Sequence, residues 1–439
     1  MATDPEEFAR LVPPDFILGV STAAFQVEGG AHARGRSVWD EFAAKPGVIV
    51  DGADGLVATD HFNRMEEDVA LMKELGIDAY RFSLAWPRIQ PTGTGAPDPD
   101  GIDFYNRLID ELLEAGIKPM ATLFHWDTPI ELEQAGGWLK RDTAQRFADY
   151  ARIAGEAFGD RVSHWVTINE PATVTLTGYA LDVHAPGYND WFKAIRATQH
   201  LLLGHGLAVR ALRDVPVRGK IGISNVHSPV FPASSRWRDR KAAEIFELLN
   251  NRVFADPILL GKAPSGAGVV GAALRAIARP SKADLQIMSE PLDFYGMHYY
   301  FPSKVAVGKA KPDSPTPELD SESMESLPIR LEPWPEYETT GFDWPIIPDL
   351  LTVQLNRMQQ RYGDRLPPVI FTEGGASFPD EPDADGEVRD TARVEYLDSH
   401  IRAALRGVRG VKVEGYFVWT FLDNLEWAAG WTQRSRLAR

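Results

Sequence analysis

Short apolar segments alternate with amphipathic helical segments along most of this chain, and this alternation limits the fold more than any other feature. Eight segments predict strands, at residues 16–20, 79–86, 118–126, 162–166, 220–230, 292–300, 368–374 and 413–422. Between them, apolar residues recur at helical spacing over residues 62–75, 105–112, 147–158, 191–212, 240–254 and 394–405. Such alternation indicates an α/β fold with a parallel sheet.

Two α/β architectures fit eight strand–helix repeats: a closed (β/α)8 barrel, or TIM barrel, and a doubly wound open sheet. The open sheet is disfavoured because no Gly-rich phosphate loop follows residues 16–20. We therefore predict one (β/α)8 domain over residues 1–439, since such barrels exceed ordinary domain lengths. Residues 304–340, rich in Pro, Ser and Glu, predict a long loop on the active-site face, which either shapes access or is merely unstructured.

Two glutamates stand where predicted strands end. Glu170 follows the fourth segment in Thr167-Ile168-Asn169-Glu170-Pro171, and Glu373 ends the seventh in Thr372-Glu373-Gly374. A glycosidase needs such a pair, because one carboxyl group protonates the leaving oxygen and the other attacks the anomeric carbon. Either glutamate alone also fits a solvated strand end, so the remaining sequence has to decide.

Composition narrows the classes of partner. The 439 residues carry a formal net charge of −16, which repels nucleic acid and anionic membranes. The absence of cysteine excludes disulfides and thiolate chemistry, and the 10 histidines are scattered without metal-ligand spacing, so we expect no metal and no cofactor. Residues 1–10 lack the order of a secretory signal and no apolar run is long enough to span a membrane, so we expect a cytoplasmic protein.

Several motifs follow one another in a distinctive order. They are Phe16-Ile17-Leu18-Gly19, Gln26-Val27-Glu28-Gly29, Arg81-Phe82-Ser83-Leu84-Ala85-Trp86-Pro87-Arg88, His125-Trp126-Asp127, Thr167 to Pro171, Tyr299-Tyr300, Thr372-Glu373 and Trp419 through Trp427. With these residues the chain resembles glycoside hydrolase family 1, the β-glucosidases, over nearly its whole length.

The resemblance implies a retaining β-glucosidase that releases terminal β-D-glucosyl residues from small β-glucosides, in carbohydrate metabolism such as cellulose degradation. It implies that Glu170 is the general acid/base, Glu373 the nucleophile, and Arg81 and Tyr300 the partners of Glu373. The two carboxyl groups of a retaining enzyme lie roughly 5–5.5 Å apart. The further sugar-binding residues that it implies are Gln26, His125, Trp126, Asn169, Glu426 and Trp427, with Trp419 under the sugar ring and Trp344 beside the aglycone.

Plainer interpretations of individual residues stay open at this level. His125 also fits a buried histidine of the core, Trp126 and Trp419 fit barrel packing, and Arg81 fits a structural ion pair. Two alternative functions also stay open, a 6-phospho-β-glucosidase and a non-catalytic sugar-binding barrel. A carboxylate at Glu426 opposes the first, because it would repel a phosphate, and the presence of both catalytic glutamates opposes the second.

Three departures from the family pattern carry expectations of their own. His298 stands where the family has Asn, and Gly374 follows Glu373 where the family also has Asn. We expect the lost side chain at Gly374 to loosen the backbone beside Glu373, and both departures to affect the rate. After Trp427 the family runs into a final helix, whereas this sequence ends at Arg439, so we expect the eighth helix to be missing. If they point outward, Phe417 or Phe421 would then face water, with weak stability or a homodimer as the consequence.

Overall fold

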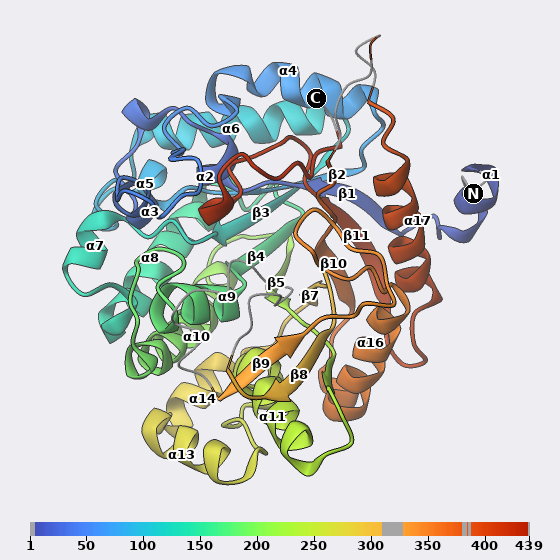
Figure 1. The fold of residues 1–439 in the computed structure, drawn as a ribbon. Helices are drawn as coiled ribbons and strands as arrows, with labels where there is room; N and C mark the ends of the chain where they lie inside the picture. Colours follow the sequence, from blue (N-terminus) through green and yellow to red (C-terminus); the bar gives the residue numbers. More distant parts are fainter. Residues whose placement is uncertain (1–4, 310–327, 380–383, 385–387, 438–439) are drawn as a thin grey trace.

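The structure is a computed structural model that describes residues 5–309, 328–379, 384 and 388–437. Eight parallel strands close into a barrel in the order β1-β11-β10-β7-β5-β4-β3-β2 (Figure 1). They are β1 (Ile17–Ser21), β2 (Ala79–Ser83), β3 (Lys118–Phe124), β4 (His164–Asn169), β5 (Lys220–Val226), β7 (Phe294–His298), β10 (Val369–Gly374) and β11 (Val413–Trp419). Each strand overlaps one of the eight predicted segments, so the predicted (β/α)8 barrel is confirmed.

Helices surround the strands, as Figure 1 shows. The longer ones are α4 (His61–Glu74), α6 (Pro99–Glu114), α8 (Arg141–Phe158), α10 (Trp191–Arg213), α16 (Asp349–Tyr362) and α17 (Thr391–Arg406). Between β5 and β7 lie α11 (Trp237–Glu247), α12 (Val253–Leu260), α13 (Gly268–Ala278) and α14 (Lys282–Met288). The short helices are α1 (Pro5–Leu11), α2 (Ala24–Val27), α3 (Val38–Ala43), α5 (Trp86–Ile89), α7 (Ile130–Gln134) and α9 (Pro171–Thr175). The predicted helical region 240–254 is divided, because a π-helical turn at Leu248–Arg252 separates α11 from α12.

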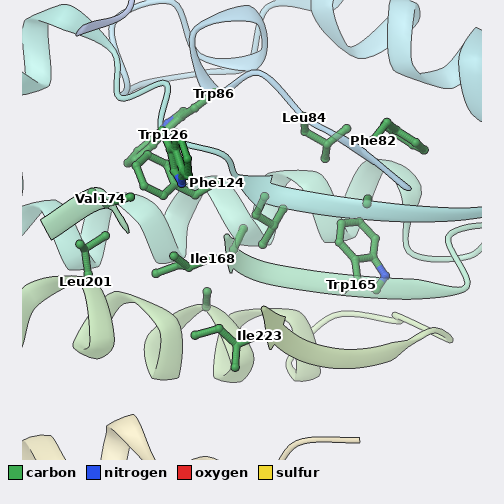
Figure 2. Close-up of a cluster of buried hydrophobic side chains, with 14 of the residues drawn as sticks. Phe82, Leu84, Trp86, Phe124, Trp126, Trp165, Ile168, Val174, Leu201 and Ile223 are labelled. Atoms are coloured by element: carbon green, nitrogen blue, oxygen red, sulfur yellow. The ribbon is translucent and has the colours of Figure 1, made fainter. Parts of the chain in front are cut away.

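The main hydrophobic core lies between the strands and the surrounding helices. In α6, the buried residues Phe104, Tyr105, Leu108, Ile109 and Leu112 recur at helical spacing, so one face of the helix packs against the barrel. Figure 2 shows another part of this layer, where Val174 of α9 and Leu201 of α10 belong to the same cluster as strand residues. The core therefore holds the strands in place from outside.

The interior of the barrel changes from apolar to polar along the strands. One buried cluster takes one residue from each of seven strands: Ile17, Ala79, Met120, Val166, Phe294, Ile370 and Phe417. Residues two positions apart on a strand face the same side. Two residues further along β2, β3 and β10 stand the buried polar side chains of Arg81, Thr122 and Thr372. This change directs polar chemistry to the C-terminal ends of the strands.

The segment 304–340 is only partly the loop that the sequence suggested. It contains most of β8 (Ser303–Val307) and all of β9 (Ile329–Glu332), which form a three-stranded sheet with β6 (Val230–Pro232). Residues 310–327 of the predicted loop lie outside the described residues. The strands escaped prediction because each is short and lies within a stretch rich in Pro, Ser and Glu.

The expectation that the end of the barrel exposes aromatic residues is wrong. Phe417 and Phe421 are both 0% exposed. The C-terminal segment folds back over this region, where the N–H of Leu437 bonds to the carbonyls of Thr420 and Phe421. Among the described residues after β11, helical structure is limited to a 3₁₀ turn at Trp427–Ala429. The homodimer stays a prediction, now without exposed Phe417 or Phe421 to support it.

Among the described residues, no helix combines the length and the apolar character that a transmembrane segment requires.

Candidate active site

Glu170 and Glu373 meet at the C-terminal end of the barrel. Glu373 belongs to β10, and Glu170 directly follows β4 at a tight turn, with a φ of 44°, before Pro171 begins α9. One carboxyl oxygen of Glu170 and one carboxyl oxygen of Glu373 lie within 4.8 Å of each other. This spacing is near the roughly 5–5.5 Å of retaining glycosidases and well below the roughly 6.5–9.5 Å of inverting ones.

Two hydrogen-bond donors hold the carboxyl group of Glu373. Nη1 of Arg81 donates to Oε1 at 2.5 Å, and the hydroxyl of Tyr300 donates to Oε2 at 3.0 Å. Arg81 is fully buried and also donates to Oδ1 of Asn169 at 2.5 Å and to Oγ1 of Thr122 at 3.1 Å. A guanidinium with several fixed acceptors has little freedom, so Glu373 is oriented by a rigid partner.

The carboxyl group of Glu170 has different surroundings. Thr173, one turn into α9, donates to Oε2 at 2.7 Å, and Nδ1 of His298 lies 2.6 Å from Oε1. Burial raises the pKa of Glu170 from its usual 4.5 to about 7, although the Thr173 hydrogen bond and the charge of Arg81 act in the opposite direction. A carboxylic acid that keeps its proton near neutral pH is suited to general acid catalysis.

His298 lies between the two carboxyl groups. It ends β7 and is fully buried, and its Nδ1 is also 3.4 Å from Oε2 of Glu373. Its Nε2 lies 2.9 Å from Oγ1 of Thr372. Burial lowers the pKa of His298 to about 3, and the charge of Arg81 lowers it further while Glu373 acts against this, so the imidazole is neutral at pH 7. The sequence identified His298 only as a departure from the family pattern, not as a contact of both glutamates.

A cavity of about 250 Å³ opens in front of the two glutamates. Of the residues predicted to bind substrate, those that line it are His125, Trp126, Tyr300, Trp344, Trp419, Glu426 and Trp427. The rings of Trp126 and Trp427 lie 4.4 Å apart between centroids, and His125 stacks on Trp419 at 5.8 Å. Trp344 stacks on Phe342 at 4.6 Å. The structure therefore brings these predicted residues together.

Gln26, Asn169 and Arg81 are fully buried and are not among the side chains that line this cavity. Because Oδ1 of Asn169 accepts from Arg81, its Nδ2 is the donor to Nε2 of His125, at 3.1 Å. A neutral His125 then carries its proton on Nδ1, and burial as the main cause holds its pKa well below the usual value. Within the described part of the chain, neither Nδ1 of His125 nor Oε1 of Gln26 has a hydrogen-bond partner.

The outer part of the cavity has an apolar wall that sequence reasoning did not find. Its residues come from α10, from α11 and the π turn after it, and from β9, and they include Trp191, Phe246, Leu249, Ile329 and Leu331. No polar residue at a strand end marks these positions in the sequence. Thr173 could have been found, since it stands three residues after Glu170 in the first turn of the helix that Glu170 precedes.

Packing around position 374 explains why a glycine follows Glu373. A β-carbon on Gly374 would lie 2.2 Å from the hydroxyl of Tyr416 and 2.7 Å from its ring. The Tyr416 ring thus occupies the space that a side chain would need. The expectation that Gly374 loosens the backbone beside Glu373 is therefore opposed by the packing around it.

Two carboxyl groups at this spacing serve few reactions, and the aromatic rings beside them suit the apolar faces of a sugar. Together with the barrel, this geometry defines a glycoside hydrolase. The comparison with known proteins gives the family: the chain belongs to glycosyl hydrolase family 1, whose family model matches residues 9–438.

Individual relatives agree with this assignment. The chain is 40% identical over 426 residues to beta-glucosidase A of Thermotoga maritima, covering 96% of this chain and 91% of the relative. It is 37% identical over 435 residues to a bifunctional beta-D-glucosidase/beta-D-fucosidase of Bifidobacterium breve, covering 97% and 92%. A solved family 1 β-glucosidase of Thermotoga maritima superposes with a TM-score of 0.88 at 39% identity, over 97% of this chain and 92% of that one.

Proposed function

We propose that this glycoside hydrolase is a retaining β-glucosidase, with Glu373 as the nucleophile and Glu170 as the general acid/base. The proposal depends on one observation above all, the approach of their carboxyl oxygens to within 4.8 Å. That separation is shorter than the roughly 6.5–9.5 Å at which an inverting enzyme holds its carboxyl groups to admit a water beside the sugar.

The two steps of double displacement follow from the surroundings of each glutamate. In the first, Glu373 forms a bond to the anomeric carbon while Glu170, whose pKa burial raises to about 7, gives its proton to the departing oxygen. The esterified Glu373 then carries no negative charge. In the second step, Glu170 takes a proton from water as the water attacks the anomeric carbon, which releases glucose and restores both groups.

The unpaired polar atoms support a sugar with several hydroxyl groups as the substrate. Nδ1 of His125 and Oε1 of Gln26 are buried and lack partners among the residues described, and hydroxyl groups of a bound glucosyl unit would supply them. In this proposal Asn169 and Glu426 bind further hydroxyls, and Trp419 supports the ring face. The names of the Thermotoga maritima and Bifidobacterium breve relatives support glucosides, with tolerance of β-fucosides.

The apolar outer wall supports aryl or other apolar aglycones. Besides the two glutamates and Trp344, the same cavity is lined by Trp191, Phe246 and Leu331. A flat apolar leaving group that packs there would gain about 25 cal/mol of binding free energy for each Å² of apolar surface removed from water. A 6-phospho-β-glucosidase is less well supported, because the carboxylate of Glu426 lines the same cavity and would repel a phosphate.

The proposal also covers location, pathway and assembly. A cytoplasmic location is compatible with the absence, in the described residues, of a helix that could cross a membrane. A role in cellulose degradation is supported by relatives named 1,4-beta-D-glucan glucohydrolase. A homodimer can be tested by sedimentation of the purified protein.

Hydrolysis of an aryl β-glucoside tests the central proposal. The wild-type protein should release the phenol, and proton NMR should show β-glucose as the first product. Glu373→Gln should lose turnover, because no glycosyl-enzyme can form. Glu67→Gln, which changes an exposed glutamate of α4, should retain it. Absence of wild-type hydrolysis, or α-glucose as the first product, would refute the proposal.

A further inference from the structure

His298 is the described side chain that contacts both proposed catalytic glutamates through a single atom. Nδ1 is 2.6 Å from Oε1 of Glu170 and 3.4 Å from Oε2 of Glu373. On its other side, Nε2 is 2.9 Å from Oγ1 of Thr372, which is itself 2.8 Å from Oγ of Ser224. The imidazole therefore joins the two carboxyl groups to a pair of buried hydroxyls.

The partners decide which nitrogen carries the proton. Two carboxyl groups face Nδ1, and an N–H directed between them is attracted by both, whereas a lone pair would be repelled by any carboxylate there. Nε2 faces a hydroxyl that can donate, and the hydroxyl of Ser224 can in turn donate to Thr372. When Nδ1 is protonated and Nε2 is not, both nitrogens of His298 and the hydroxyl of Thr372 each have a hydrogen-bond partner.

We propose that His298 is a positioning residue that donates from Nδ1 to the ionised form of Glu170 and so lowers the pH at which Glu170 gives up its catalytic proton. This inference rests on the proposed role of Glu170 as the acid/base. The hydrogen bond is strongest when Glu170 is negatively charged, so it opposes the effect of burial. His298 thereby sets the upper end of the pH range of the enzyme.

Other charged and titratable groups around His298 lie on, or directly after, four strands of the barrel. Besides the two glutamates they are Arg81 of β2, His125 after β3, His227 after β5 and Tyr300 after β7. Arg81 is bound to Glu373 and Asn169, and burial holds the pKa of His125 and of His227 below the usual value. Hence burial keeps His125 and His227 neutral over the pH range in which Glu170 titrates.

Variants of His298 test the inference through the pH dependence of kcat/KM for an aryl β-glucoside, whose alkaline limb reports the acid of the free enzyme. His298→Leu removes the donor, so the alkaline limb should move upward by about one pH unit. His298→Asn places an amide N–H near the position of Nδ1 and should shift it by less than half as much. An alkaline limb that stays in place or moves downward in His298→Leu would overturn the proposal.

His205 provides a matched control. It is also fully buried, and its Nδ1 lies 2.7 Å from the hydroxyl of Thr167, but none of its contacts is a carboxyl group. His205→Asn should reduce stability without moving the alkaline limb. An equal shift in this variant would mean that loss of any buried histidine changes the profile, and would overturn the specific role of His298.

A measurement on the unaltered protein covers the case in which the variants do not fold. Nitrogen-15 NMR of the imidazoles should show His298 protonated at Nδ1 and unprotonated at Nε2 between pH 6 and 8, an interval of about two units around neutrality. A proton on Nε2, or on both nitrogens, would overturn the proposal. Because this readout needs no turnover, its failure is distinguishable from failure of the β-glucosidase proposal.

Discussion

The buried side chain of Glu170 makes the stability of the folded protein depend on pH. Its pKa is about 7 in the folded protein and 4.5 without the protein environment, and burial is the main cause. Between these values the folded protein binds more protons than the unfolded chain. The stabilisation is therefore fully present below pH 4.5 and is lost as the pH rises through about 7.

Glu170→Gln should reveal this contribution, because glutamine has no proton to lose. Relative to the wild-type protein, the variant should gain melting temperature as the pH rises from about 5 to 8. Differential scanning calorimetry of both proteins across this range is the measurement. The exposed Glu67→Gln variant should show no such trend, and a pH-independent difference for Glu170→Gln would contradict the raised pKa.

The same substitution should separate good from poor leaving groups. A departing oxygen of high pKa needs a proton, whereas a nitrophenolate departs without one. For Glu170→Gln, the glycosylation rate should fall by a factor of about 100 or more for an alkyl β-glucoside and much less for a dinitrophenyl β-glucoside. Pre-steady-state measurement of phenol release, with glucose release for the alkyl substrate, checks this. Equal losses for both substrates would mean that Glu170 is not the acid.

At this scale the sequence indicated the proposed catalytic pair but not its connections. Glu170 and Glu373 were visible because each stands at the end of an apolar segment, and strand ends converge in a barrel. The position of His298 was visible only as an unusual residue. Its contact with both glutamates depends on β7 lying between β5 and β10, which no local pattern reveals.

Among the elements, the small sheet of β6, β8 and β9 brings apolar side chains to the cavity. In β9, Ile329 and Leu331 are buried and line the cavity, while Arg330 between them does not. Alternation along a strand explains this arrangement. The four-residue strand was too short to recognise in the sequence, since its alternation covers only two apolar positions.

Leu331→Asn should therefore weaken binding of aryl aglycones. Loss of about 55 Å² of apolar contact at about 25 cal/mol per Å² corresponds to roughly a tenfold fall in kcat/KM for an aryl β-glucoside. Methyl β-glucoside, whose aglycone is too small to reach the outer wall, should be affected little. Arg330→Gln on the opposite face of β9 is the control. A similar loss for both substrates would show that Leu331 supports the fold rather than the aglycone.

For the whole molecule, the repeated pattern predicted eight strands but could not specify how the barrel closes. Closure is made by β1 and β11, which pair in parallel from Ile17 with Gly415 to Ser21 with Trp419. These strands stand at opposite ends of the sequence, so their register follows from packing and not from local pattern. The expectation of exposed aromatic residues failed for the same reason, because it treated β11 without its interior partners.

Phe417 of β11 should be a main support of that closure. Its ring fills the space beside Gly19 of β1, where a β-carbon would come within 2.5 Å of it, and it belongs to the apolar cluster inside the barrel. Phe417→Ala should cost about 3–5 kcal/mol in the free energy of unfolding, because the closed interior cannot collapse around the cavity. Val394→Ala on α17, a residue that is 55% exposed, should change it by less than about 0.5 kcal/mol. Urea denaturation followed by tryptophan fluorescence measures both, and equal small losses in the two variants would mean that closure does not depend on this interior contact.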